Sequence, residues 1–109
     1  MLYIVTKPPE FVPGVFTCSE LSQSSASSLL KEHYASQDYQ PFIFHGSTKR
    51  ALMELSDLSF SMAPKKQPIP APRTGDVFLY VTLGERETSG PPKLDDHLFF
   101  QISYSKTTS

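Results

Sequence analysis

The chain has 109 residues, of which 10 are Lys or Arg and 11 are Asp or Glu, so its formal net charge is −1 at pH 7. This length allows one domain of the usual size, roughly 100–150 residues, and excludes (β/α)8 barrels and two-domain dehydrogenases. Proteins that bind a nucleic-acid duplex through many phosphates normally carry a basic surplus, so the charge argues against a duplex partner. Proline is the compositional outlier, with 10 residues in the chain.

The contents of cysteine and histidine exclude several kinds of site. Cys18 is the only cysteine, so the chain forms no intrachain disulfide and no cysteine-rich zinc site, and we expect Cys18 to lie in the core. The three histidines lack the spacing of metal ligands, so no metal and no cofactor is expected. No apolar run approaches the roughly 20 residues that span a bilayer. We therefore expect a cytoplasmic protein without a membrane partner.

The first half of the chain predicts two strands, a helix and a third strand. Runs rich in apolar and β-type residues at 2–6 and 15–19 are typical of short strands. Apolar residues recur at helical spacing over 22–34, which predicts a helix with Ser19 or Ser22 as its N-cap and serines on its solvent face. A low-complexity linker is the alternative for this segment. Residues 41–44 are almost wholly apolar, which predicts a buried central strand.

The second half predicts a helix, a proline-rich connection and two further strands. An apolar stripe over 49–58 predicts the helix, and the prolines of 59–73 predict an exposed connection or edge. Strands are expected at 77–83 and 97–104, separated by a polar loop and by a turn or short helix at 93–96. About five strands and two or three helices predict a single α/β (α+β) domain with a mixed sheet. The domain is expected over residues 1–104, followed by a polar tail at 105–109.

A candidate site lies where the apolar run 41–44 ends and a helix begins. His45 stands at this junction, which is where open α/β sheets bind ligands. Gly46 allows a ligand close to the backbone, and the N–H groups of a helix start, with the hydroxyls of Ser47 and Thr48, suit a phosphate. An imidazole beside a phosphodiester transfers protons near neutral pH. The pattern predicts a phosphate-handling site, and a capped helix beside an incidental histidine is the alternative.

The polar loop after the strand at 77–83 holds a second candidate region. Arg86 is suited to clamp a phosphate or to stabilise developing charge. Glu87 beside it is suited to orient His45 or to act as a base. A solvated surface loop is the alternative interpretation of this region. His33, near a helix end, and His97, which opens a strand, are expected to be less useful.

These residues resemble a known family, the small viral ring nucleases. The family comprises type III anti-CRISPR proteins of archaeal and bacterial viruses and has cellular relatives in CRISPR loci. His45 and Thr48 fall on the His and Thr of its Gly-His-x-x-Thr-Ala helix start, and Arg86 falls on the Arg of its Arg-Leu-Pro-Glu-Gly run. The chain has Phe44 where the family has Gly, and Ser89 where the family has Glu. These departures fit a divergent cellular member better than a close viral copy.

The resemblance implies a homodimer that binds a cyclic oligoadenylate in a cleft between its subunits. It implies cleavage of the ring without metal, by attack of the ribose 2′-OH, which switches off type III CRISPR signalling. The enzyme then has to align this hydroxyl, hold the phosphate and protonate the leaving oxygen. The implied catalytic residues are His45 as general acid, Arg86 and Glu87. The implied substrate-binding residues directly follow His45 in the chain and are Gly46, Ser47, Thr48 and Lys49.

Two other classes of function remain open at the level of sequence. The same cleft would serve a non-catalytic protein, a sponge or sensor that binds a cyclic nucleotide and returns it intact. The proline stretch 64–72 would serve an interaction module that binds a partner domain. Replacing these prolines would then abolish partner binding and leave ligand binding unchanged.

Overall fold

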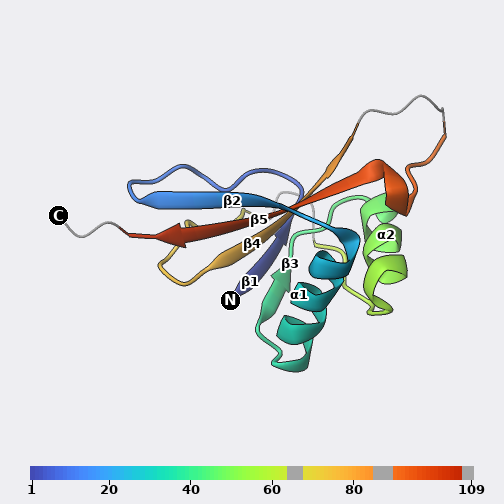
Figure 1. Cartoon of the computed structure of the whole chain (residues 1–109), viewed down its shortest axis with the longest axis horizontal. Helices are drawn as coiled ribbons and strands as arrows, with labels where there is room; N and C mark the ends of the chain where they lie inside the picture. Colours follow the sequence, from blue (N-terminus) through green and yellow to red (C-terminus); the bar gives the residue numbers. More distant parts are fainter. Residues whose placement is uncertain (64–67, 85–89, 107–109) are drawn as a thin grey trace.

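The computed structural model describes residues 1–63, 68–84 and 90–106. These residues form an α+β domain with a five-stranded mixed sheet of order β2-β5-β4-β1-β3 and two helices (Figure 1). The strands are β1 (Leu2–Val5), β2 (Val15–Leu21), β3 (Tyr39–Pro41), β4 (Val77–Leu83) and β5 (His97–Ser105). The helices are α1 (Gln23–Ala35), α2 (Gly46–Ser56) and the one-turn 3-10 helix η1 (Leu94–Asp96).

The directions of the strands explain where a site can form. β1 pairs in parallel with both β3 and β4, whereas β5 pairs antiparallel with β4 and with β2. The carboxyl ends of the parallel strands β1 and β4 therefore meet at one end of the sheet, where α/β proteins commonly bind ligands.

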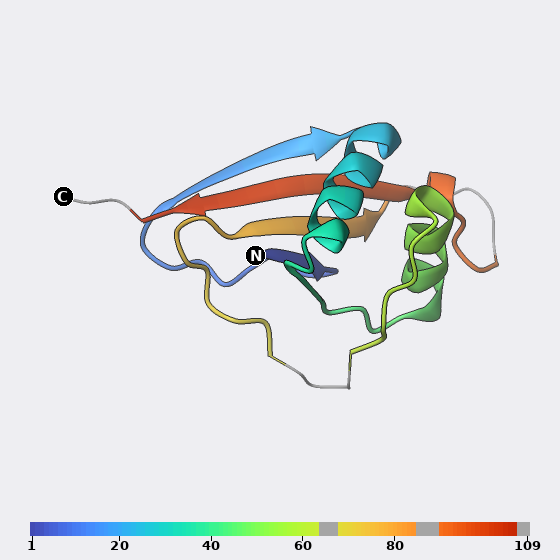
Figure 2. The same cartoon turned by 90° about the horizontal axis from the view of Figure 1, so that it is seen from below.

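Both long helices lie on the same face of the sheet (Figures 1 and 2). Side chains alternate along a strand, so every second residue of β1, β4 and β5 faces the helices. Burying one large apolar side chain stabilises the folded state by roughly 1.5–3 kcal/mol. The many apolar side chains buried in this layer therefore make it the main core of the domain. The fully buried members of this core are Leu2, Ile4, Ala26, Leu30, Ile43, Leu52, Leu79, Val81 and Phe99.

A second apolar cluster occupies the opposite face of the sheet. Val5, Phe42 and Phe78 are fully buried there. The connection from α2 to β4 spans both faces, since Phe60 packs in the helix-side core and Ile69 packs against the second cluster. Figure 2 shows the described parts of this connection passing outside the edge of the sheet.

Most of the predicted elements are confirmed. The predicted strands at 2–6, 15–19, 77–83 and 97–104 correspond to β1, β2, β4 and β5. The helix at 22–34 is α1, so the linker alternative is wrong, and Ser22 is its N-cap because its Oγ accepts the N–H of Ser25 at 3.2 Å. The second helix begins at Gly46, three residues earlier than predicted. The turn or short helix at 93–96 is η1.

The prediction of a buried central strand at 41–44 is wrong. β3 covers Tyr39–Pro41 and lies at an edge of the sheet, beside β1. Phe42 and Ile43 follow it and are fully buried, and the N–H of Phe42 donates to the carbonyl of Ile4 at 2.8 Å. An apolar run predicts that its residues are buried without saying which element they belong to. Here Phe42 and Ile43 are buried by packing after the strand has ended.

The prediction of a core position for Cys18 is also wrong. Cys18 is exposed on β2, which forms the other edge of the sheet. In the proline-rich connection Pro68 and Pro70 are exposed and Pro72 is buried, and residues 64–67 lie outside the described residues. Ser105 still belongs to β5, whereas 107–109 of the predicted tail are not described. None of the helices in the described ranges is long and apolar enough to cross a membrane.

Candidate functional site

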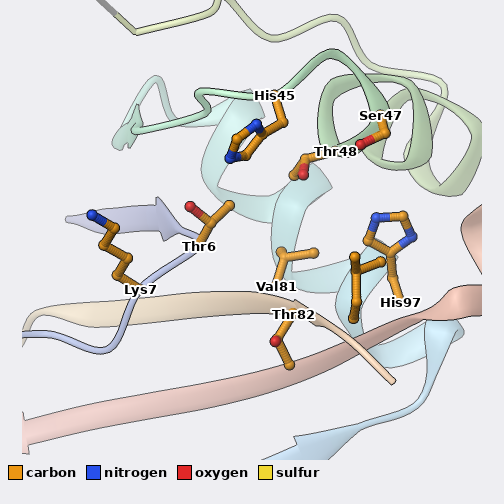
Figure 3. A pocket seen from close by; sticks show the side chains of 9 residues that line it. Thr6, Lys7, His45, Ser47, Thr48, Val81, Thr82 and His97 are labelled. Carbon is orange, nitrogen blue, oxygen red and sulfur yellow. The ribbon is translucent and has the colours of Figure 1, made fainter. Parts of the chain in front are cut away.

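A pocket of about 390 Å³ opens where the carboxyl ends of β1 and β4 meet the start of α2 (Figure 3). Two residues that follow β1, three at the start of α2, three of β4 and the first residue of β5 line it. They are Thr6, Lys7, His45, Ser47, Thr48, Val81, Thr82, Leu83 and His97. The pocket thus brings together segments from four different parts of the chain.

His45 is the N-cap residue of α2. Its backbone is extended, with φ −125° and ψ 136°, and its carbonyl accepts the N–H of Lys49 at 3.2 Å. Its side chain makes no capping hydrogen bond and is exposed. Figure 3 shows the imidazole directed into the pocket. The ring is therefore available to a ligand.

The first turn of α2 supplies hydrogen-bond donors beside this imidazole. The N–H groups of a first helical turn have no partner within the helix and carry the positive end of its dipole. Ser47 is half-buried and Thr48 is buried, and both line the pocket. Gly46 is exposed, and a Cβ at this residue would meet no atom within 4 Å, so the backbone here is open to close approach. Three predicted residues, His45, Ser47 and Thr48, thus come together in one pocket.

The other predicted residues do not line the pocket in the described part of the chain. Lys49 is half-buried on α2, one residue beyond Thr48, and is absent from the lining. Arg86 and Glu87 lie outside the described residues. They follow β4, whose last residue, Leu83, lines the pocket.

Four polar residues of the pocket were missed or ranked low by sequence reasoning, namely Thr6, Lys7, Thr82 and His97. Thr6 and Lys7 come directly after β1, and His97 opens β5 opposite Leu83 of β4. The signal for Thr6 and Lys7 is their place after an N-terminal strand, but it becomes useful only when β1 is known to be parallel to β4. His97 carries no local signal, since it is brought to the pocket by an antiparallel pairing.

The charge of the pocket favours an anion. Lys7 contributes an ammonium group, and the exposed His45 adds an imidazole. No carboxylate is found among the lining residues in the part of the chain that the structure describes. Hydroxyls, imidazoles and one ammonium group at a helix start are suited to hold a phosphate and to exchange protons with it.

The described residues hold no metal-binding cluster, and a phenol with a raised pKa belongs to the aromatic packing. Within the described ranges no three His, Cys, Asp or Glu side chains gather as a metal ion would require. Burial, and next the carboxylate of Asp76, raise the pKa of the Tyr3 phenol, while the guanidinium of Arg73 opposes them. The Tyr3 ring stacks on Phe78 with centroids 5.3 Å apart, so its position is that of a packed aromatic residue.

Comparisons with known proteins identify a similar fold. No protein-family model matches the chain, and the search of curated proteins found no match. Among solved structures, B116 of Sulfolobus turreted icosahedral virus is similar with a TM-score of 0.73 and 14% sequence identity. The match covers 94% of this chain and 97% of that chain. At this identity the likeness shows that a viral protein shares the fold.

Proposed function

We propose that this protein is a ring nuclease that binds a cyclic oligoadenylate at the start of α2 and cleaves it without a metal ion. The observation that carries the proposal is the pocket itself, where the exposed imidazole of His45 stands beside the first turn of α2 and Lys7. These groups bind a phosphodiester and donate a proton to it. The motif around His45 and the viral protein of the same fold support this assignment.

The proposed reaction uses the nucleophile that the substrate carries. The ribose 2′-oxygen attacks the adjacent phosphorus, the bond from phosphorus to the 5′-oxygen breaks, and His45 donates a proton to that oxygen. The products are a 2′,3′-cyclic phosphate and a 5′-hydroxyl. The N–H groups of Gly46 and Ser47 hold the phosphate oxygens, with the hydroxyl of Thr48 and the ammonium of Lys7 nearby. Alignment and charge stabilisation then account for most of the catalysis.

Arg86 and Glu87 complete the proposed set of residues. Arg86 holds the phosphate from the loop after β4 and stabilises the charge that develops on it. Glu87 orients His45 or accepts a proton. Both roles rest on the resemblance to the ring nucleases and on the position of these residues next to a strand that ends in the pocket.

The size of the pocket favours a homodimer. Its volume of about 390 Å³ is near the lower end for sites of single small molecules, ~300–1,000 Å³, whereas the ligand is a ring of several nucleotides. Two pockets, one from each subunit, would share such a ring. The homodimer is therefore part of the proposal.

The second copy is proposed to dock on the face of the sheet opposite the helices. A groove of about 340 Å³ lies there, and Thr82 lines both this groove and the pocket. A subunit seated in the groove therefore lies next to the site. None of the described residues that line the groove is charged, so two copies can face each other there without repulsion. Its lining residues are Pro8, Pro9, Phe11, Phe16, Cys18, Tyr80, Thr82, Phe100 and Ile102.

The test is incubation with cyclic oligoadenylates of three, four and six units in EDTA, followed by chromatography. We expect the wild-type protein to open at least one ring and to release a 2′,3′-cyclic phosphate. His45→Ala should slow this by ~10²–10⁴-fold, the usual contribution of a general acid. His33→Gln is the matched control, because His33 lies outside the pocket and bonds the carbonyl of Asp38 at 3.1 Å. Equal rates for His45→Ala and wild type would refute the role of His45.

A non-catalytic sponge or sensor is the second candidate. The same donors and Lys7 would hold a cyclic nucleotide whether or not His45 transfers a proton. Wild-type protein that binds a ring and returns it intact would establish this function instead of cleavage.

A further inference from the structure

His97 is held in one tautomer at the rim of η1. It is buried, with 6% of its surface exposed, and its Nδ1 lies 2.7 Å from the carbonyl oxygen of Lys93. A carbonyl oxygen only accepts hydrogen bonds, so Nδ1 carries the proton. In the neutral ring Nε2 then presents a lone pair, which makes it an acceptor or a base.

The other edge of the ring faces the pocket. Figure 3 shows one ring nitrogen of His97 turned toward the start of α2, with Ser47 and Thr48 nearby. No residue in the described ranges forms a hydrogen bond with Nε2. A buried polar atom without a protein partner is destabilising, and a catalytic role is one of the explanations for such an atom. The geometry therefore presents a base to whatever enters the pocket.

Two hydrogen bonds made by Asp96, one through its carboxylate and one through its carbonyl, hold the turn beside this ring. The N–H of Lys93 donates to the carboxylate of Asp96 at 2.8 Å, and the N–H of Gly84 donates to the carbonyl of Asp96 at 2.9 Å. The turn that carries the Lys93 carbonyl is thus attached to the end of β4. His97 itself pairs with Leu83 in the sheet. A side chain on such rigid elements is well suited to precise chemistry.

We propose that Nε2 of His97 is the general base of the reaction, which rests on the ring-nuclease function proposed above. In Figure 3 the rings of His45 and His97 stand on different elements, with Thr48 between them. An in-line displacement needs its base and its acid on opposite sides of the phosphorus. The imidazoles of His45 and His97 come from different elements and line one pocket, which suits them to act as acid and base in this way.

The substrate and the imidazoles of His45 and His97 supply and accept every proton in this step. The 2′-O–H bond breaks and its proton moves to Nε2 of His97, while the bond from the 2′-oxygen to phosphorus forms. The bond from phosphorus to the 5′-oxygen breaks, and this oxygen takes a proton from His45. Exchange of protons with water returns both rings to their starting states.

A cyclic oligoadenylate with sulfur in place of one bridging 5′-oxygen distinguishes the role of the general base from the role of the general acid. We call it the sulfur substrate, and the unmodified cyclic oligoadenylate the oxygen substrate. A leaving thiolate needs no proton, so loss of the general acid ceases to matter on the sulfur substrate. His97→Asn is the informative variant, because its amide N–H₂ can replace Nδ1 as the donor to Lys93 while Nε2 is removed. We expect His97→Asn to slow cleavage of both substrates, the oxygen and the sulfur form, by ~10²–10⁴-fold. His45→Ala should cleave the oxygen substrate slowly and should cleave the sulfur substrate at close to the wild-type rate.

Binding and unfolding measurements complete the test. His97→Asn should bind the intact ring within a few-fold of wild type and unfold at the same temperature, and His97→Gln replaces it if His97→Asn does not fold. The assignment of His97 would be overturned if His97→Asn or His97→Gln cleaved the oxygen substrate at the wild-type rate. It would also be overturned if either variant regained the wild-type rate on the sulfur substrate. If the wild-type protein cleaved neither substrate, the ring-nuclease function would be overturned, and with it the role of His97 as general base.

Discussion

The three histidines show how the environment of a single residue decides its chemistry. His33 bonds the Asp38 carbonyl at 3.1 Å and lies 3.8 Å from the Asp38 carboxylate, so it ties the end of α1 to the chain that follows. His97 bonds a carbonyl with one nitrogen and turns the other to the pocket. His45 has no capping bond and is exposed. Only His45 and His97 are placed for proton transfer with a ligand.

Gly46 provides a prediction at the residue scale. A Cβ at Gly46 would meet no protein atom, so Gly46→Ala should keep the fold and raise the free energy of unfolding by up to ~1 kcal/mol. If a phosphate approaches this backbone closely, the added methyl group should weaken binding of the ring about tenfold, or ~1.4 kcal/mol. Calorimetric titration and urea unfolding measure the two effects. Unchanged binding would mean that the ligand does not approach Gly46.

At the scale of elements, α2 presents the site at one end and ends in strained backbone at the other. Asp57 is its C-cap in the left-handed conformation, with φ 58°, and its N–H donates to the carbonyl of Met53 at 2.8 Å. Glycine adopts this conformation without steric cost, and a carboxylate at a helix C-terminus opposes the helix dipole. The helix is therefore not optimised at the end remote from the site.

Asp57→Gly should stabilise the protein by up to ~1 kcal/mol. Denaturant unfolding measures this change, and the cleavage rate should stay at the wild-type value because Asp57 is remote from the pocket lining. Asp57→Ala is the matched control, since it removes the charge and keeps the strained backbone. If Ala and Gly stabilise equally, the charge rather than the backbone conformation accounts for the effect.

At the scale of the whole molecule, the two faces of the sheet have different roles. The helices cover one face, whereas the groove on the other face holds exposed Phe11 and Cys18 and half-buried Tyr80. Exposed apolar surfaces of this kind mark interaction sites in many proteins. Thr82 connects this face to the pocket, so the oligomeric state and the activity are expected to change together.

Tyr80→Glu tests the proposed dimer. In a symmetric dimer it would place two like charges in the apolar interface, so the molecular mass by sedimentation should fall from dimer to monomer. Ring cleavage should fall with it. The single thiol, Cys18, should react with a thiol reagent faster in this variant than in wild type, because the groove is uncovered.

Tyr34→Glu is the matched control for this experiment, since Tyr34 lies on α1 and is 36% exposed. It should remain dimeric, with slow labelling of Cys18. A wild-type protein that sediments as a monomer at the concentration at which it cleaves the ring would refute the dimer.

Local patterns predicted most elements because they are set by residues close in the chain. Ser22 caps α1 through a bond to Ser25, and the sequence places both within one helical turn. The sequence also predicted a helix shortly after His45, although the predicted first residue, 49, lies three residues after the observed start at Gly46. The run at 41–44 was misassigned because an apolar stretch reports burial without saying whether a strand or the packing beyond it provides that burial. Cys18 was misplaced because its exposure depends on β2 lying at an edge.

The sequence by itself determined the α+β composition, a helix that begins within a few residues of His45, and residue types there that are suited to bind phosphate. Only the tertiary structure decided that Lys7, Thr48 and His97 line one pocket. Parallel pairing brings the end of β1 to the end of β4, and antiparallel pairing brings His97 opposite Leu83. Both depend on contacts between residues far apart in the chain. Local propensity does not encode strand order or register, so the second imidazole of the site became visible only in the folded sheet.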